Sequence, residues 1–81
     1  MIQKIMEAYP DDVFLKANGF DDAIIGVDEG GMRLIYSESK CIDILQNEHD
    51  MTLIDAIEYF DFNVKGAYMG EGTPIWCSDI F

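Results

Sequence analysis

The sequence contains little of what most catalytic sites require. It has one histidine, two cysteines and five basic residues among 81 positions. A serine or cysteine nucleophile needs a base and an orienting group beside it, and His49 is the one imidazole that can act as the base. His49 follows a predicted helix, where a cation interacts well with the last carbonyls, so we interpret it as a helix-ending residue. We assign no catalytic residue.

Metal ligands are equally scarce. Zinc needs four Cys or His ligands, or three with a water, and Cys41, Cys77 and His49 show no ligand spacing. Paired carboxylates are plentiful, but none follows the alternating pattern of a calcium-binding loop. We therefore expect no metal and no other cofactor. Cys41 and Cys77 are interpreted as small buried apolar residues of a protein in a reducing compartment.

Long apolar runs are also missing. Runs such as Val13–Leu15 and Ala23–Ile25 span three residues, whereas a membrane helix needs about 20. The N-terminus lacks the apolar core of a signal peptide. We expect a cytoplasmic protein that does not enter a membrane.

Basic residues are too few to balance the acidic ones. Five Lys and Arg against sixteen Asp and Glu leave a net charge of −11, spread along the chain. This charge repels nucleic-acid phosphates and attracts basic surfaces, so we expect a protein partner with a basic surface and no direct nucleic-acid binding. The length predicts a single domain over residues 1–81, and the apolar fraction of 49% leaves a homo-oligomer open.

Hydrophobic periodicity predicts a helix at each side of a β-hairpin. Apolar residues at 2, 5, 6 and 9 share one helical face before Pro10. The runs 23–27 and 32–36 flank Asp28-Glu29-Gly30-Gly31 and predict an antiparallel hairpin whose glycines supply positive φ angles. Residues 11–19 form either a second short helical turn or a packed loop. Ser37 caps the next predicted helix, which runs to about Glu48 with Cys41, Ile42 and Leu45 on its inner face.

The C-terminal half predicts one more helix and one more strand. Thr52 and Asp55 form a capping box for a helix that runs to about Lys65 and ends at Gly66. Pro74 opens a short strand, which we expect at a sheet edge. The predicted fold class is α+β, with a small three-stranded antiparallel sheet, made of the hairpin and the C-terminal strand, and two to three packed helices.

The last predicted helix has an unusual outer face. Its inner stripe comprises Leu53, Ala56, Ile57, Phe60 and Val64, and Phe62 falls opposite it. Aromatic residues are enriched at the centres of interfaces, and an acidic surround favours a basic partner. The candidate interaction surface comprises Asp55, Glu58, Tyr59, Asp61 and Phe62. The alternative is that the C-terminal tail folds over Phe62 and buries it within the monomer.

The stretch from Asp55 to Trp76, DAIEYFDFNVKGAYMGEGTPIW, resembles a group of small uncharacterised proteins of tailed bacteriophages, in which EYF.FN..GAY.GE.TPIW strings recur. The resemblance implies a phage origin and the host cytoplasm as the place of action, and it supplies no catalytic residue. It marks a family segment made of Gly66, Tyr68, Gly70, Glu71, Thr73, Pro74 and Trp76.

Two functional hypotheses remain. The one we prefer is a small acidic, non-enzymatic interaction protein that binds a basic or host macromolecule. The alternative is a small enzyme or small-molecule-binding module, with an aromatic pocket where Tyr68, Glu71 and Trp76 meet the helix that carries Tyr59 and Phe62. A Glu71 enclosed in a pocket would favour the second hypothesis, and an exposed Glu71 would favour the first.

Overall fold

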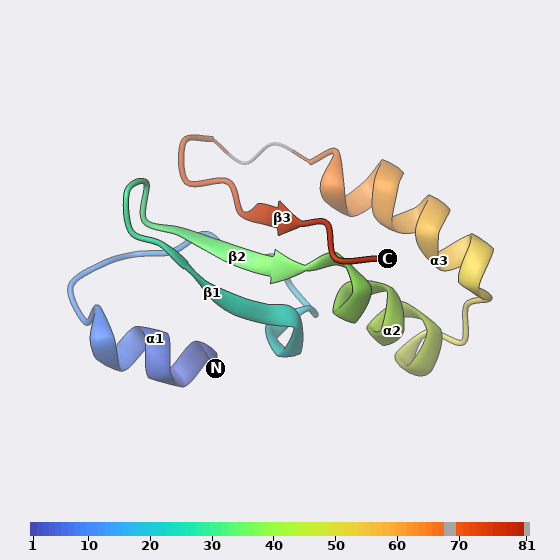
Figure 1. Cartoon of the computed structure of the whole chain (residues 1–81), viewed down its shortest axis with the longest axis horizontal. Helices are drawn as coiled ribbons and strands as arrows, with labels where there is room; N and C mark the ends of the chain where they lie inside the picture. Colours follow the sequence, from blue (N-terminus) through green and yellow to red (C-terminus); the bar gives the residue numbers. More distant parts are fainter. Residues whose placement is uncertain (68–69, 81) are drawn as a thin grey trace.

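The computed structural model describes residues 1–67 and 70–80 and contains a three-stranded sheet, with helices before its first strand and between its second and third strands (Figure 1). Within these residues, no helix is long and apolar enough to cross a membrane. The strand order is β1-β2-β3, and the α+β prediction is confirmed. In chain order the elements are α1 (Ile2–Ala8), the 3-10 turn η1 (Asp21–Ala23), β1 (Ile24–Asp28), β2 (Arg33–Ser37), α2 (Glu38–Glu48), α3 (Leu53–Tyr59), the π-helix η2 (Phe60–Lys65) and β3 (Ile75–Cys77).

Strands β1 and β2 form the predicted antiparallel hairpin, in which Val27 pairs with Leu34. Leu34 and Tyr36 are fully buried on one face of β2, as the alternation of side chains along a strand predicts. The turn itself differs from the prediction. The residue with positive φ is Met32, at 49°, and not either of the two glycines. The Asp28 carboxylate accepts the Gly30 amide at 3.2 Å, which shows that an aspartate side chain helps to close the turn.

The third strand corrects the sequence-based prediction. β3 runs parallel to β2, with Ile35 opposite Ile75 and Ser37 opposite Cys77, so the sheet is mixed and not purely antiparallel. Parallel neighbours need a long crossover, which here consists of α2, α3 and η2. After the helices the chain returns to the end of the sheet where β2 begins (Figure 1). There the Thr73 carbonyl accepts the Arg33 Nε–H at 2.6 Å.

One hydrophobic core joins the sheet to the helices. Residues after Pro10 form a packed loop and not a second helical turn, and the buried Tyr36 hydroxyl accepts the Ala17 amide of this loop at 2.9 Å. Strand β3 lies at a sheet edge, as expected. The buried apolar side chains are Ile5, Phe14, Ala17, Phe20, Ala23, Ile24, Leu34, Tyr36, Cys41, Ile42, Leu45, Ala56 and Phe60.

The predicted Ser37 cap and the Thr52 half of the predicted capping box are present. The Ser37 hydroxyl accepts the Lys40 amide at 3.2 Å at the start of α2, and the Thr52 hydroxyl accepts the Asp55 amide at 3.2 Å at the start of α3. Helix α2 ends at Glu48, and the amide of the following residue, His49, donates a hydrogen bond to the Leu45 carbonyl. The predicted buried stripe on the next helix is only partly right, because Leu53 is 53% exposed.

Candidate functional site

The predicted interaction surface is exposed in the structure. Asp55, Glu58 and Tyr59 lie on α3 and Asp61 and Phe62 on η2, and all five side chains face solvent. Phe62 is 82% exposed and Tyr59 is 43% exposed. The alternative prediction, that the C-terminal tail buries Phe62, is therefore wrong.

The outward position of Phe62 follows from the neighbouring residues that are buried in the core. Ala56 and Phe60 are buried and fix the inner face of the α3–η2 segment. Phe62 follows Phe60 by two positions, which is about half a helical turn, so its ring points outward. A water-exposed aromatic ring of this kind contributes little to the hydrophobic free energy of folding.

Sequence reasoning missed one member of this surface. Ile54 is 69% exposed and lies one turn before Glu58 and two turns before Phe62. The signal was present in the sequence, because Ile54 lies about 100° around the helix from Leu53 and therefore outside the predicted inner stripe. With Ile54 included, the acidic-aromatic face comprises Ile54, Asp55, Glu58, Tyr59, Asp61 and Phe62.

The described residues of the family segment pack in the fold and do not enclose the predicted aromatic pocket. Trp76 packs between Tyr36 and Phe60, with ring centroids 5.1 and 5.3 Å away, so its ring belongs to the interior contacts and not to a cleft beside Phe62. Glu71 is exposed. Tyr68 lies outside the described residues. The pocket hypothesis therefore loses its enclosed carboxylate and its tryptophan wall.

The remaining residues of that segment shape a turn. Gly66 follows the last residue of η2, and Gly70 has a φ of 108°, a conformation that side chains other than glycine rarely adopt. The Thr73 hydroxyl donates to the Gly70 carbonyl at 2.7 Å, and Pro74 is buried before β3. These contacts explain Gly70, Thr73 and Pro74 by the reversal that delivers the chain to β3, whereas Gly66 has a φ of −78° and does not adopt the left-handed conformation expected of a helix-ending glycine.

The chemistry of the cysteines matches their interpretation as packing residues only in part. Cys41 is buried, and this burial, together with the nearby negative charges of Glu38 and Asp79, raises the pKa of its thiol to about 12. The thiol therefore stays protonated and unreactive at neutral pH. Cys77 is half-buried on β3. Among residues 1–67 and 70–80, no three His, Cys, Asp or Glu side chains are grouped so that they can hold a metal ion.

A small polar network holds the C-terminal tail on α2. Asp79 accepts hydrogen bonds from the Ser37 hydroxyl at 2.5 Å and from the Ser39 amide at 2.9 Å. These donors lower the pKa of the Asp79 carboxyl. Nearby, the buried Glu38 carboxylate is paired with Lys65 of η2 at 3.1 Å. Both carboxylates lie in or against the first turn of α2, where the helix dipole favours negative charge.

Three shallow hollows among the described residues are the best candidates for a ligand site, and neither Glu71 nor Trp76 lines any of these three. Two lie on either side of Tyr59 and share Asn18 and Phe20, with volumes of about 190 and 200 Å³. The third is a groove of about 120 Å³ between α2 and α3. All are smaller than the roughly 300–1,000 Å³ typical of small-molecule sites.

Comparisons with known proteins identify no relative. No family model, no curated protein and no solved structure matches the chain. The function must therefore be inferred from the acidic-aromatic face and the hollows of the structure.

Proposed function

We propose that this protein is a non-enzymatic interaction protein that binds a basic protein surface through the acidic-aromatic face of α3 and η2. The observation that supports it is the 82% exposure of Phe62 next to Asp61 in the sequence and one helical turn from Glu58. Exposing a large aromatic ring to water is unfavourable for an isolated monomer, and such rings anchor interfaces when a partner covers them.

The charges on this face are available to a partner. Within the described residues the side-chain ion pairs are Lys16–Asp21 and Lys65–Glu38, and neither uses Asp55, Glu58 or Asp61. These three carboxylates, which no ion pair neutralises, are part of the net charge of −11 and place it on this face. Such a field accelerates the approach of basic partners and repels phosphates.

The resemblance to phage proteins extends the proposal to the place of action. A phage-encoded protein of this kind would meet its basic partner in the cytoplasm of the bacterial host.

Capture from a bacterial lysate with matched charge variants tests the proposal. The Glu58→Lys/Asp61→Lys variant changes the face, and the Asp11→Lys/Asp12→Lys variant makes the same change of net charge at exposed loop positions. We expect a basic protein to be retained by the wild type and by the loop variant, and to be lost from the face variant and at about 0.5 M salt. Equal retention by both variants would mean that the face does not bind, and the proposal would be wrong.

A further inference from the structure

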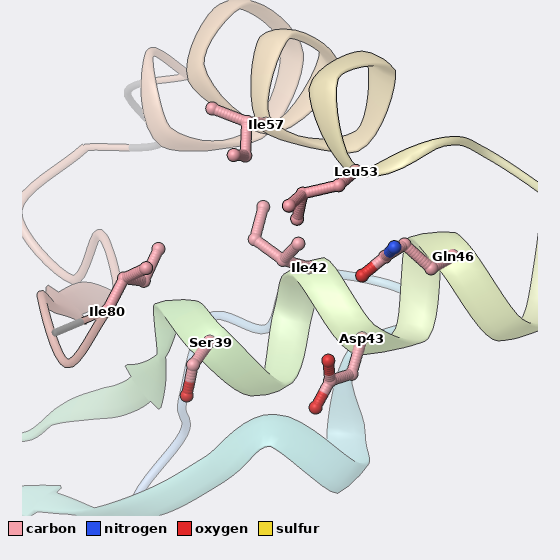
Figure 2. A pocket seen from close by; sticks show the side chains of 7 residues that line it. All are labelled: Ser39, Ile42, Asp43, Gln46, Leu53, Ile57 and Ile80. Carbon is pink, nitrogen blue, oxygen red and sulfur yellow. The ribbon is translucent and has the colours of Figure 1, made fainter.

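A second feature lies between α2 and α3, on the side of α3 that carries Leu53 and Ile57. Four aliphatic side chains from α2, α3 and the tail, Ile42, Leu53, Ile57 and Ile80, gather around the groove between the two helices (Figure 2). Ile42 is buried at its floor, whereas Leu53 and Ile80 are 53% and 51% exposed at its walls. The groove is thus an apolar depression that is open to solvent.

The size of the groove restricts its occupant. A volume of about 120 Å³ is too small for a typical metabolite or drug-sized ligand, which needs roughly 300 Å³ or more. It is comparable with a single large apolar side chain. Protein interfaces concentrate their binding free energy where one such anchor enters a small apolar pocket.

The groove is held by elements that are already ordered. Its two helices start at the Ser37 and Thr52 caps, and the tail wall is held by the Asp79 hydrogen bonds to Ser37 and Ser39. Little of the site has to be ordered when a partner binds, which reduces the entropic cost of association.

The negative charge around the groove determines which kind of partner can bind in it. Asp43 lines the groove, and residues 38–65 carry seven carboxylates and two lysines. A second copy of this chain would bring the same negative charge to the groove, which like-charge repulsion opposes. A basic segment would instead find complementary charge at Asp43 and in the net charge of −11 of the whole chain.

The shape of the groove favours a helical partner over an extended one. A depression between two neighbouring helices accepts the apolar side chains of a third helix, spaced three or four residues apart. An extended peptide would pair with a sheet edge, and neither edge strand, β1 or β3, lines the groove. The groove therefore fits an amphipathic helix better than a strand.

We infer that the α2–α3 groove receives the apolar anchor of a basic amphipathic helix, whose lysines or arginines contact Asp43 at the rim of the groove. The inference rests on the proposed function, since it specifies the element of the basic partner that binds. It assigns the apolar contact to Ile42, Leu53, Ile57 and Ile80.

A defined probe tests the assignment. We choose a synthetic peptide of about 15 leucine and lysine residues, long enough to form a helix on binding, with leucines on one face. Methyl NMR of the whole protein should show the largest shifts at Ile42, Leu53, Ile57 and Ile80, with NOEs to the peptide leucines. Leu53→Ser should weaken binding about tenfold. Val13→Ser, a matched truncation of an exposed loop residue, should leave the affinity unchanged.

Two control peptides separate this inference from the proposed function. A peptide of the same composition with its leucines dispersed around the helix retains the charge but lacks the apolar face, and it should bind about tenfold more weakly. Equal binding by both peptides, or an unchanged affinity in folded Leu53→Ser, would overturn the groove assignment and leave the proposed function intact. A glutamate-for-lysine peptide that binds as tightly as the basic one would refute the basic partner itself. Shifts at the groove methyls that depend on protein concentration alone would identify a second copy as the occupant and overturn the inference.

Discussion

Replacing Tyr36 with phenylalanine tests how the loop before β1 is attached to the core. The Tyr36 hydroxyl accepts the Ala17 amide at 2.9 Å, and both residues are buried. The substitution keeps the ring and its packing against Trp76, and it removes only the acceptor. The Ala17 N–H is then left inside the protein without its partner, since water does not reach it freely. Leaving a buried donor unpaired costs about 1–3 kcal/mol, so we expect the free energy of unfolding to fall by about 2 kcal/mol.

Urea denaturation measures this loss. The chain has one tryptophan, Trp76, which packs against Tyr36 and Phe60, so its fluorescence reports directly on the core. A small domain has an m-value of about 1 kcal/mol/M or somewhat more, and the midpoint should therefore fall by about 1–2 M. The slope should stay the same, because the variant exposes the same surface on unfolding.

Tyr9→Phe provides the matched control for Tyr36→Phe. The Tyr9 hydroxyl donates to the Glu29 carboxylate at 2.8 Å in an exposed position, where water can replace the lost partner. We expect an unchanged midpoint for this variant. A Tyr36→Phe midpoint within about 0.3 M of the wild type, or equal shifts in both variants, would refute the proposed attachment of the loop.

Three further predictions concern the caps and the exposed ring. Thr52→Ala removes the acceptor for the Asp55 amide and should lower the free energy of unfolding by about 1 kcal/mol in urea denaturation; an unchanged midpoint would mean that the cap is dispensable. Asp79 has a lowered pKa, so its stabilising contribution is complete above the unfolded pKa of about 3.9 and is lost as the pH falls through the folded value. Asp79→Asn should therefore lower the thermal midpoint at pH 7 and lose less stability than the wild type between pH 6 and pH 3; parallel pH profiles would contradict this. Phe62→Ala should leave the urea midpoint unchanged, because the ring is 82% exposed. It should increase the dissociation rate of a captured partner by the factor that corresponds to a loss of about 2 kcal/mol of binding free energy. Unfolding of this variant would place the ring in the core.

Local signals explain the parts of the fold that could be predicted from the sequence. The hairpin follows from an apolar, mostly β-branched run and an alternating run on either side of a turn-forming segment. The starts of α2 and α3 follow from Ser37 and Thr52, whose hydroxyls accept hydrogen bonds from amides three residues away. Each of these interactions lies within a few residues of the chain. Propensity and periodicity are informative at that range.

The parts that could not be predicted depend on contacts that are distant in the sequence. The direction of β3 depends on the path of residues 70–74 and on the contact between Thr73 and Arg33, which are 40 positions apart. The exposure of Leu53 depends on a groove whose wall is Ile80, far along the chain. Helical periodicity places Leu53 on the inner face, but it cannot show how far α2 and the tail extend over that face.

The candidate site also has one part that local sequence patterns predict and one part that depends on contacts distant in the sequence. The helical pattern separated Phe62 from the buried stripe, but whether the tail covered it depended on where β3 and the tail lie. Because β3 pairs with β2, Trp76 packs against Tyr36 and Phe60, and the tail continues to the start of α2, where Asp79 is bonded. This route takes the tail along the α2–α3 groove and not over the outer face of η2.

The parallel pairing of β3 therefore has a consequence for the proposed function. With this pairing, Trp76 packs against Phe60 in the interior and stabilises the fold. Phe62 and Tyr59 stay outside, among carboxylates that form no ion pair with a basic residue of the described chain. Residues that stabilise the fold and residues that we propose to bind a partner are thus different residues, although Phe60 and Phe62 are two positions apart. Substitutions on the acidic-aromatic face should change binding without changing folding, and substitutions at Phe60 or Trp76 should do the reverse. A protein in which both sets of substitutions changed stability equally would have no separate binding face.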